Sequence, residues 1–136
     1  MNSHISFITL GVEDLGRAKQ FYADGLGWPV QVAQGQYVAF TPHDGSSTLT
    51  LYPRQVLAAD AGVPPAGEGF RGFTLSYVVR SDDRVDALLA DAQRAGGTIV
   101  RPAQKARWGG YFGYFADPDG NLWKVVAGDG EQPYAE

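Results

Sequence analysis

The stretch ITLGVEDL, residues 8–15, decides the fold, because its pattern changes from that of a strand to that of a helix. Apolar side chains alternate from Ile5 to Val12, as in a β-strand that buries one face. Asp14 is of a residue type that caps the N-terminus of a helix. Apolar residues then recur at helical spacing as far as Tyr22, and the glycines from Gly25 onward end the helix. The stretch therefore predicts a strand followed directly by a helix.

Three short strands are expected after this helix. They are separated by turn residues, among them His43-Asp44-Gly45. The expected strands are Val30–Val32, Gln36–Phe40 and Thr48–Tyr52. The first part of the chain thus has the order βαβββ.

The same order recurs further along the chain. A strand at Phe73–Val79 is followed by Ser81 or Asp82, either of which is suited to cap a helix with an apolar stripe. Three strands follow, the last two joined by a tight turn at residues 117–120. These strands are Thr98–Arg101, Tyr111–Ala116 and Leu122–Val126. A repeated order of elements is a strong signal of architecture.

The expected organisation is one domain over residues 1–136, made of two modules. Module 1 covers about 1–53 and module 2 about 72–128, with a Pro- and Gly-rich connector without regular structure at about 54–71. The tail after Gly128 is expected to fray. The fold class is α+β, with two βαβββ modules forming curved mixed sheets around a cavity.

Composition excludes several classes of protein. The 136 residues are 44% hydrophobic and 19% charged, with a net charge of −4 and no cysteine. Disulfides and thiolate metal sites are therefore absent. A nucleic-acid partner is not expected without a basic excess, and neither a membrane span nor a signal peptide is expected from the apolar runs. We expect a cytoplasmic protein that acts on a small molecule.

At this point the chain resembles a known family. Residues 8–15, Phe21-Tyr22 and Leu26-Gly27 are similar to the first-module signature of the vicinal oxygen chelate superfamily. Residues 115–121 resemble its last hairpin, and Trp108–Tyr111 is similar to a large bacterial subgroup without assigned function. The superfamily includes glyoxalases, extradiol dioxygenases and bleomycin-resistance proteins. The resemblance implies the fold, whereas the function depends on the site.

The resemblance also implies a metal site. Four side chains, usually His or Glu, lie on the first and last strands of each module and hold one divalent ion. The corresponding positions here are Phe7, Thr50, Phe73 and Lys124. These side chains cannot hold the expected ion, and a shift by one residue brings in no His, Asp or Glu. We therefore expect no metal and no cofactor. The two histidines, His4 and His43, are expected to be exposed and without a role.

The strand pattern predicts an aromatic cavity face with a few hydroxyl groups and one cation. It is expected to carry Phe7, Thr9, Thr50, Tyr52, Phe73, Leu75, Tyr77, Leu122 and Lys124. The predicted ligand-binding residues are Phe7, Thr50, Tyr52, Phe73, Tyr77, Trp108, Tyr111 and Lys124. These side chains could instead fill the cup. The aromatic-glycine stretch at 108–114 could likewise be either a lid over the ligand or a bend with core aromatics.

The charged residues near this face have more than one possible role. Lys124 is interpreted as a hook for an anion or carbonyl, as a general base, as a salt-bridge partner of a carboxylate, or as a cation whose ammonium group lies at the cavity mouth. Arg54 is either a second contact for an acidic ligand or a surface residue. Asp117 and Asp119 are expected to cap a turn rather than to act in catalysis.

The leading hypothesis is a metal-free protein that binds a small planar or aromatic ligand, with an anionic group as an option. The resemblance to binding-type resistance proteins implies a homodimer. The first alternative is a lyase, isomerase or dioxygenase-like enzyme with a non-standard site, for which the catalytic candidates are Lys124, Tyr52 and Tyr77. The second alternative is a structural or regulatory homodimer with a filled cavity.

Overall fold

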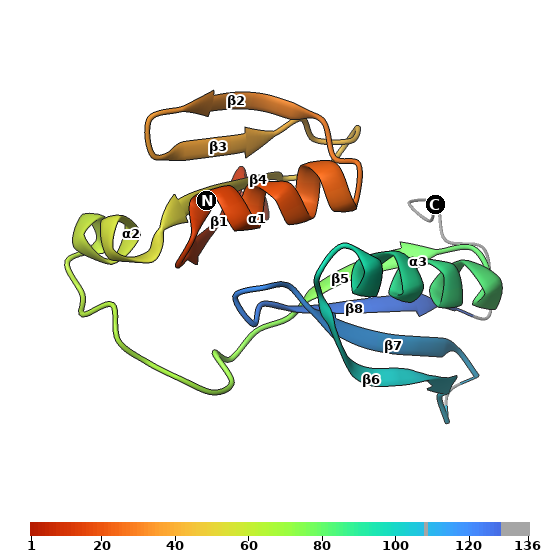
Figure 1. Cartoon of the computed structure of the whole chain (residues 1–136). Helices are drawn as coiled ribbons and strands as arrows, with labels where there is room; N and C mark the ends of the chain where they lie inside the picture. The colour runs from red at the N-terminus through yellow and green to blue at the C-terminus, as the bar shows by residue number, and fades with distance from the viewer. Residues whose placement is uncertain (108, 129–136) are drawn as a thin grey trace. The chain divides into compact units, whose positions relative to one another are not determined.

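A computed structural model describes residues 1–107 and 109–128. The chain divides into two compact units, Met1–Gly69 and Phe70–Glu136. Each unit contains a four-stranded mixed sheet with a helix against it (Figure 1). The predicted α+β class with two βαβββ modules is confirmed.

The first unit follows the predicted order of elements. Its sheet has the strand order β1-β4-β3-β2, in which β1 runs parallel to β4 and the other pairs are antiparallel. Its elements are β1 (Phe7–Val12), α1 (Leu15–Gln20), a π-helical turn η1 (Phe21–Gly25), β2 (Val30–Gln34), β3 (Tyr37–Phe40), β4 (Thr48–Pro53) and α2 (Arg54–Ala61). Asp14 caps α1 as predicted, because its carboxylate accepts a hydrogen bond of 3.0 Å from the backbone N–H of Arg17.

The second unit repeats this arrangement. Its sheet order is β5-β8-β7-β6, again with one parallel pair, β5 and β8. Its elements are β5 (Leu75–Val79), α3 (Asp82–Arg94), β6 (Thr98–Lys105), β7 (Tyr111–Ala116) and β8 (Leu122–Ala127). Of the two candidate caps, Ser81 is the one used, since its hydroxyl accepts a bond of 3.2 Å from the N–H of Arg84.

Each unit has its own core between the sheet and the helix. In the first unit, Ala18, Phe21 and Tyr22 are buried together with alternate residues of β1 and β4 such as Leu10. In the second, the predicted apolar stripe of α3 is buried against β7 and β8. Its fully buried members are Val85, Leu89 and Ala92. On the opposite face of the first sheet, α2 packs at Gly11, where an added Cβ would lie 3.2 Å from Arg54 Cα and 3.4 Å from Leu57 Cδ2.

The connector contains an element that was not predicted. Helix α2 occupies residues 54–61, so the prediction of a connector without regular structure is wrong there. Pro53 was read as the start of a loop, yet proline is well tolerated at a helix N-terminus. Gly62, with a φ of 75°, ends the helix in the left-handed conformation. The guanidinium of Arg54 binds the carbonyl oxygens of Pro65 and Gly67, which holds the rest of the connector against this helix.

Several strand boundaries differ from the prediction by one to four residues. Strand β5 begins at Leu75 rather than Phe73, and β6 continues to Lys105 instead of ending at Arg101. Two irregularities in the β6–β7 pairing interrupt the alternation on β6, which is why its far half was not recognised. The predicted fraying of the tail falls mostly on residues 129–136, outside the described residues.

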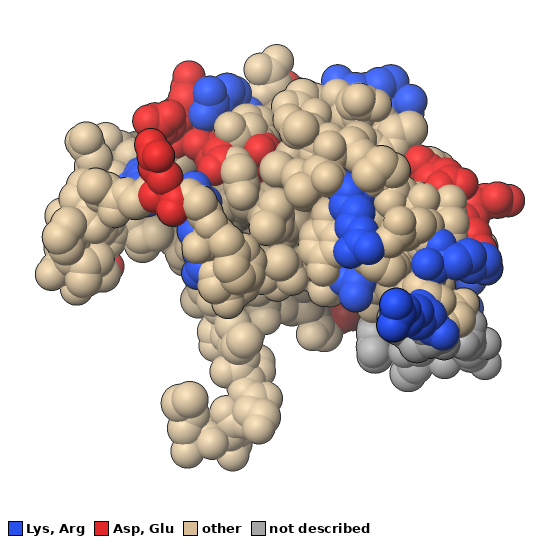
Figure 2. All heavy atoms as spheres, turned by 90° about the horizontal axis from the view of Figure 1, so that it is seen from below, with Lys and Arg blue, Asp and Glu red and all other residues tan. Residues whose placement is uncertain are grey.

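The length and hydrophobicity of the helices and the positions of charged side chains are further features of the structure. Within residues 1–107 and 109–128, no helix is long and apolar enough to cross a membrane. Figure 2 shows one face of the molecule, on which Lys and Arg side chains lie in several separate groups among acidic and uncharged residues.

Candidate functional site

The open face of the first sheet, defined as the side opposite α1, carries the residues predicted for it. Phe7, Thr9 and Gly11 share one side of β1 and pair in register with Thr48, Thr50 and Tyr52 of β4. The hydroxyls of Thr9 and Thr50 form a hydrogen bond of 2.7 Å, which confirms that both point to the same side. This face therefore has the composition that its strand pattern indicates.

Aromatic rings occupy both ends of this open face. Tyr37 of β3 packs against Tyr52, with ring centroids 5.2 Å apart. At the other end Phe7 is 58% exposed, whereas Thr50 between them is only 2% exposed. Tyrosine and phenylalanine rings offer flat apolar surfaces for stacking. Tyr37 was not among the predicted ligand-binding residues, although its alternation with Ala39 would have placed it on this side.

The second sheet corrects the predicted cavity face. Lys124 of β8 pairs with Ser76 of β5, whereas Tyr77 pairs with Val125. Residues that pair in register lie on the same side of a sheet, so Tyr77 and Lys124 lie on opposite sides. Gly113, which pairs with Val125, faces α3, because an added Cβ would come within 2.6 Å of the Cδ1 atom of Leu89.

The expectation that Tyr77 and Leu75 share the face of Lys124 is therefore wrong. Both lie on the side of α3, in register with Val125 and Trp123. The error came from starting the alternation at Phe73, which lies outside β5 and is 49% exposed. The open face of the second sheet instead carries Ser76, Phe112, Tyr114, Leu122, Lys124 and Val126.

The third of the four metal positions moves by one residue for the same reason. In the first unit, Phe7 lies seven residues before the helix cap Asp14. Seven residues before the second cap, Ser81, is Thr74 and not Phe73. Thr50 and Lys124 remain equivalent, because each pairs with the residue five positions before its helix cap. The structural repeat thus fixes the four positions without reference to any ligand.

The side chains at these positions do not fit the superfamily's divalent ion. They are Phe7, Thr50, Thr74 and Lys124, which offer no carboxylate and no imidazole. A phenylalanine has no donor atom, and an ammonium group repels a cation. In the described part of the chain, no three His, Cys, Asp or Glu side chains are grouped as metal ligands. His4 and His43 are both exposed.

The environment of Lys124 is aromatic and includes a second cation. Its Nζ atom lies 4.8 Å from the centroid of the Phe112 ring. The guanidinium carbon of Arg101, on β6, lies 5.0 Å from the same centroid. Tyr114 packs edge-on against Phe112, with centroids 6.1 Å apart. Arg101, Phe112 and Tyr114 were not predicted as site residues. Because Gly113 faces α3, its two neighbours on the strand, Phe112 and Tyr114, face the opposite side of the sheet.

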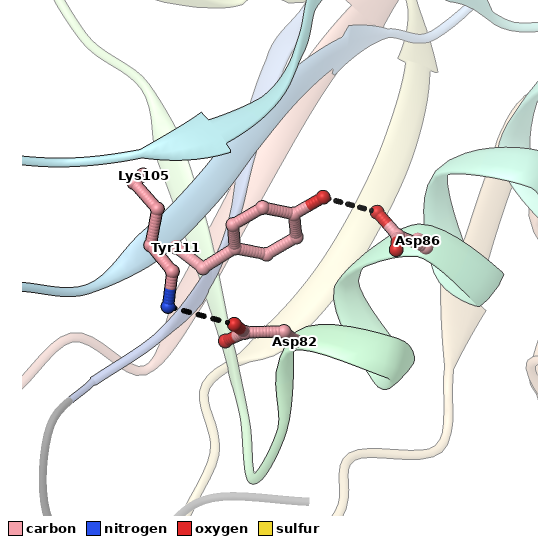
Figure 3. Close-up of polar contacts among 4 residues, drawn as sticks. All are labelled: Asp82, Asp86, Lys105 and Tyr111. Carbon is pink, nitrogen blue, oxygen red and sulfur yellow. Dashed lines mark hydrogen bonds and ion pairs between the residues drawn. The ribbon is translucent and has the colours of Figure 1, made fainter.

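Tyr111, predicted to contact the ligand, is engaged on the opposite side (Figure 3). Its hydroxyl donates a hydrogen bond of 2.8 Å to the carboxylate of Asp86 on α3. This bond, some burial and the negative charges of Asp86, Asp82 and Asp83 raise the pKa of Tyr111 above its ordinary 10.0. Beside it, Lys105 forms an ion pair of 3.0 Å with Asp82. We therefore leave Tyr111 out of the proposed binding surface.

Two further predictions concern Trp108 and the last hairpin. Trp108 lies outside the described residues. Asp117 caps the hairpin turn as expected, accepting bonds from the N–H groups of Asp119 and Asn121 and from the side-chain amide of Asn121. Arg71 adds bonds to the Asn121 side chain and the Asp119 carbonyl oxygen, at 2.7 and 2.9 Å. These carboxylate contacts are structural ones.

Comparison with known proteins agrees with this fold. A family model described as Glyoxalase/Bleomycin resistance protein/Dioxygenase superfamily matches residues 4–125. The chain belongs to this superfamily. The predicted resemblance is thereby confirmed.

Individual relatives support the same assignment. The crystal structure of a glyoxalase-related enzyme from Fulvimarina pelagi has a TM-score of 0.87 and 28% identity, covering 99% of this chain and 96% of that one. A lactoylglutathione lyase from Agrobacterium tumefaciens has a TM-score of 0.65 and 27% identity, covering 94% and 96%. The uncharacterized protein YraH of Bacillus subtilis is 26% identical over 87% of this chain and 93% of its own length.

Proposed function

We propose that this chain binds a small planar or aromatic molecule without the help of a metal ion. The observation that carries the proposal is the set of side chains at the four ligand positions, Phe7, Thr50, Thr74 and Lys124. Relatives that use a metal need carboxylate or imidazole donors there. Three uncharged side chains and one ammonium group provide none.

The open sheet faces support an aromatic ligand. The Tyr37 and Tyr52 rings of the first sheet and the Tyr114 ring of the second are partly exposed and present apolar surface beside their hydroxyl groups. Such surfaces bind flat ligands by stacking and by excluding water. From the predicted ligand-binding set, the proposal keeps Phe7, Thr50, Tyr52 and Lys124.

The test combines a ligand screen with metal analysis on the intact protein. A panel of planar acids, phenols, neutral arenes and cationic drugs is examined by thermal unfolding in the presence of a chelator. A ligand that binds only the folded state raises the melting temperature with its concentration. We expect a rise for at least one planar class, and the same rise after addition of divalent metal.

Two results would contradict the proposal. A stoichiometric divalent ion that survives dialysis would restore a metal-dependent function. A flat response over the whole panel would argue against ligand binding and favour a purely structural role. Turnover of a bound compound without metal, abolished by Tyr52→Phe or Lys124→Met in a folded protein, would instead indicate an enzyme with a non-standard site.

The setting we propose for this function is a cytoplasmic homodimer. Strand β2 lies at the edge of its sheet and is exposed along its length, including Val30 and Val32 at 37% each. An exposed apolar edge strand is a common site of association. The absence of cysteine from the sequence is compatible with a reducing compartment. Sedimentation analysis of the intact chain tests the dimer, and a monomer at micromolar concentration would contradict it.

A further inference from the structure

One row of residues crosses the open face of the second sheet at a single register level. Arg101 of β6 pairs with Tyr114 of β7, which pairs with Lys124 of β8, which in turn pairs with Ser76 of β5. Every member of this row carries a hydrogen-bond donor, and two members are cationic. We refer to these four residues as the donor row.

Both cations of the donor row lie close to the ring of Phe112. The Nζ atom of Lys124 and the guanidinium carbon of Arg101 lie 4.8 and 5.0 Å from the centroid of Phe112. Phe112 is only 9% exposed, so each cationic group lies beside a buried apolar ring. The ring face attracts each cation, but the cations repel one another, and this repulsion grows as water is removed. An anion bound on this face of the sheet would lower the repulsion.

The equivalent row of the first sheet has no charge. It consists of Thr9, Thr50, Ala39 and Val32. Its two hydroxyls are bonded to one another at 2.7 Å. Thr50 and Lys124 occupy equivalent register positions. The row of the second sheet therefore differs from that of the first by two cations close to an aromatic ring.

We propose that the donor row is a subsite for the carboxylate group of a planar organic acid. This inference rests on the proposed function and names the chemical class of its ligand. The guanidinium of Arg101 can donate to the oxygens of a carboxylate, and its Nε and Nη2 also lie within hydrogen-bond reach of the Gln104 side-chain amide. Lys124 adds a second charge, and the phenol of Tyr114 lies between them in register. The partly exposed ring of Tyr114 offers its surface to the ring that bears the carboxylate.

Binding of benzoate to the intact protein tests the subsite, with benzamide as its neutral counterpart and phenyl phosphate as a different oxyanion. Affinities are measured by titration calorimetry or from amide chemical shifts. We expect benzoate to bind at least about tenfold more tightly than benzamide, because a hydrogen bond to a charged group contributes about this much. We also expect it to bind more tightly than phenyl phosphate.

The variants are Lys124→Met and Arg101→Gln, with Lys105→Met as the matched control. Lys105 has the same charge and lies on the same sheet, but its ammonium group is directed to Asp82 of α3 (Figure 3). We expect each test variant to lose about tenfold in benzoate affinity with little change for benzamide. The control should change benzoate affinity by less than about twofold, because exposed ion pairs contribute little.

The outcomes separate this inference from the proposed function. If benzoate and benzamide bind equally, or if the two variants leave their ratio unchanged, the carboxylate subsite is wrong while aromatic binding stands. If phenyl phosphate binds more tightly than benzoate, the ligand class is wrong. If neither these probes nor any member of the planar panel binds, the proposed function fails and the inference fails with it. Circular dichroism melting shows whether a variant is still folded.

Discussion

The hydroxyl oxygens of Thr9 and Thr50 lie 2.7 Å apart across the parallel pair β1 and β4, and Thr50 occupies one of the four positions at which the superfamily resemblance implies a metal ligand. Thr50 is 2% exposed, whereas Thr9 is partly exposed. Replacing Thr9 leaves the buried hydroxyl of Thr50 without a partner or water. Replacing Thr50 leaves the hydroxyl of Thr9, which water can reach. The hydrogen bond should therefore respond unequally to its two deletions.

The first prediction follows from this asymmetry. Thr9→Val should lower the free energy of unfolding by about 1–3 kcal/mol, and Thr50→Val by less than about 1 kcal/mol. The double variant should cost less than the sum of the two single variants, because it leaves neither hydroxyl unpaired. Urea unfolding of the four proteins gives the coupling energy. Additive costs would show that the two hydroxyls do not depend on one another.

Gly113 provides a second prediction, about the contact between α3 and β7. A Cβ atom at this position would lie 2.6 Å from Leu89 Cδ1 and 3.0 Å from the carbonyl oxygen of Arg101. Leu89 could rotate, but the backbone of β6 could move only by distorting the sheet. Gly113→Ala should therefore destabilise the chain by about 1–3 kcal/mol, measured by chemical unfolding.

The matched control for this change is Gly16→Ala. Gly16 lies in the first turn of α1, and its nearest contact for an added Cβ is Asp14 Oδ1 at 3.5 Å. Alanine favours the helix here by up to about 1 kcal/mol, so this variant should be neutral or more stable than the wild type. Equal destabilisation by both substitutions would rule out the close packing of α3 as the cause.

Local signals in the sequence predicted most of the fold. The caps Asp14 and Ser81 and the hairpin turn at residues 117–120 act within a few residues, so their chemistry is visible in the sequence itself. Helix α2 was missed for a local reason as well. The segment was interpreted as a connector from its prolines and glycines, although Pro53 stands at a helix N-terminus, where the missing N–H group of proline costs no hydrogen bond.

The donor row was less accessible to sequence reasoning. Arg101, Tyr114 and Lys124 come from three strands, and only the pairing register brings them to one level. The irregularities in the β6–β7 pairing change the side to which β6 residues point, and Pro102, which lies within the second of them, was not used as a signal. Tyr77 was assigned to the wrong face because the alternation was counted from Phe73, outside β5, and the pairing of Ser76 with Lys124 that corrects it joins residues far apart in the sequence.

A third prediction concerns the hairpin between β7 and β8. Asp117 is 3% exposed, and its carboxylate accepts three hydrogen bonds of 2.8–2.9 Å from Asp119 and Asn121. Asp117→Ala leaves these donors unpaired, which should cost more than about 2 kcal/mol in thermal or urea unfolding. Asp44→Ala, in an exposed turn, should stay within about 0.5 kcal/mol of wild type. If the two variants lose similar amounts of unfolding free energy, the buried hydrogen bonds of Asp117 do not stabilise the hairpin.

The last prediction uses the raised pKa of Tyr111. Its hydroxyl bond to Asp86 exists only in the protonated form, and the carboxylates near it disfavour tyrosinate. The pKa of Tyr111 is higher in the folded than in the unfolded chain, so its contribution to stability is fully present below pH 10.0 and is lost as pH rises through the folded value. Stability should therefore fall more steeply above this pH in the wild type than in Tyr111→Phe.

Tyrosinate absorbance provides the direct measurement. The titration of the wild type minus that of Tyr111→Phe should show one phenol with a midpoint above 10.0. In Asp86→Asn this midpoint should move down, because the variant removes the negative charge and weakens the acceptor that are the main causes of the shift. Lys105→Met removes the ion pair with Asp82 but leaves the Asp86 bond in place, so the midpoint should remain above 10.0 in that variant. An unshifted phenol in the wild type would mean that the Asp86 contact does not persist in solution.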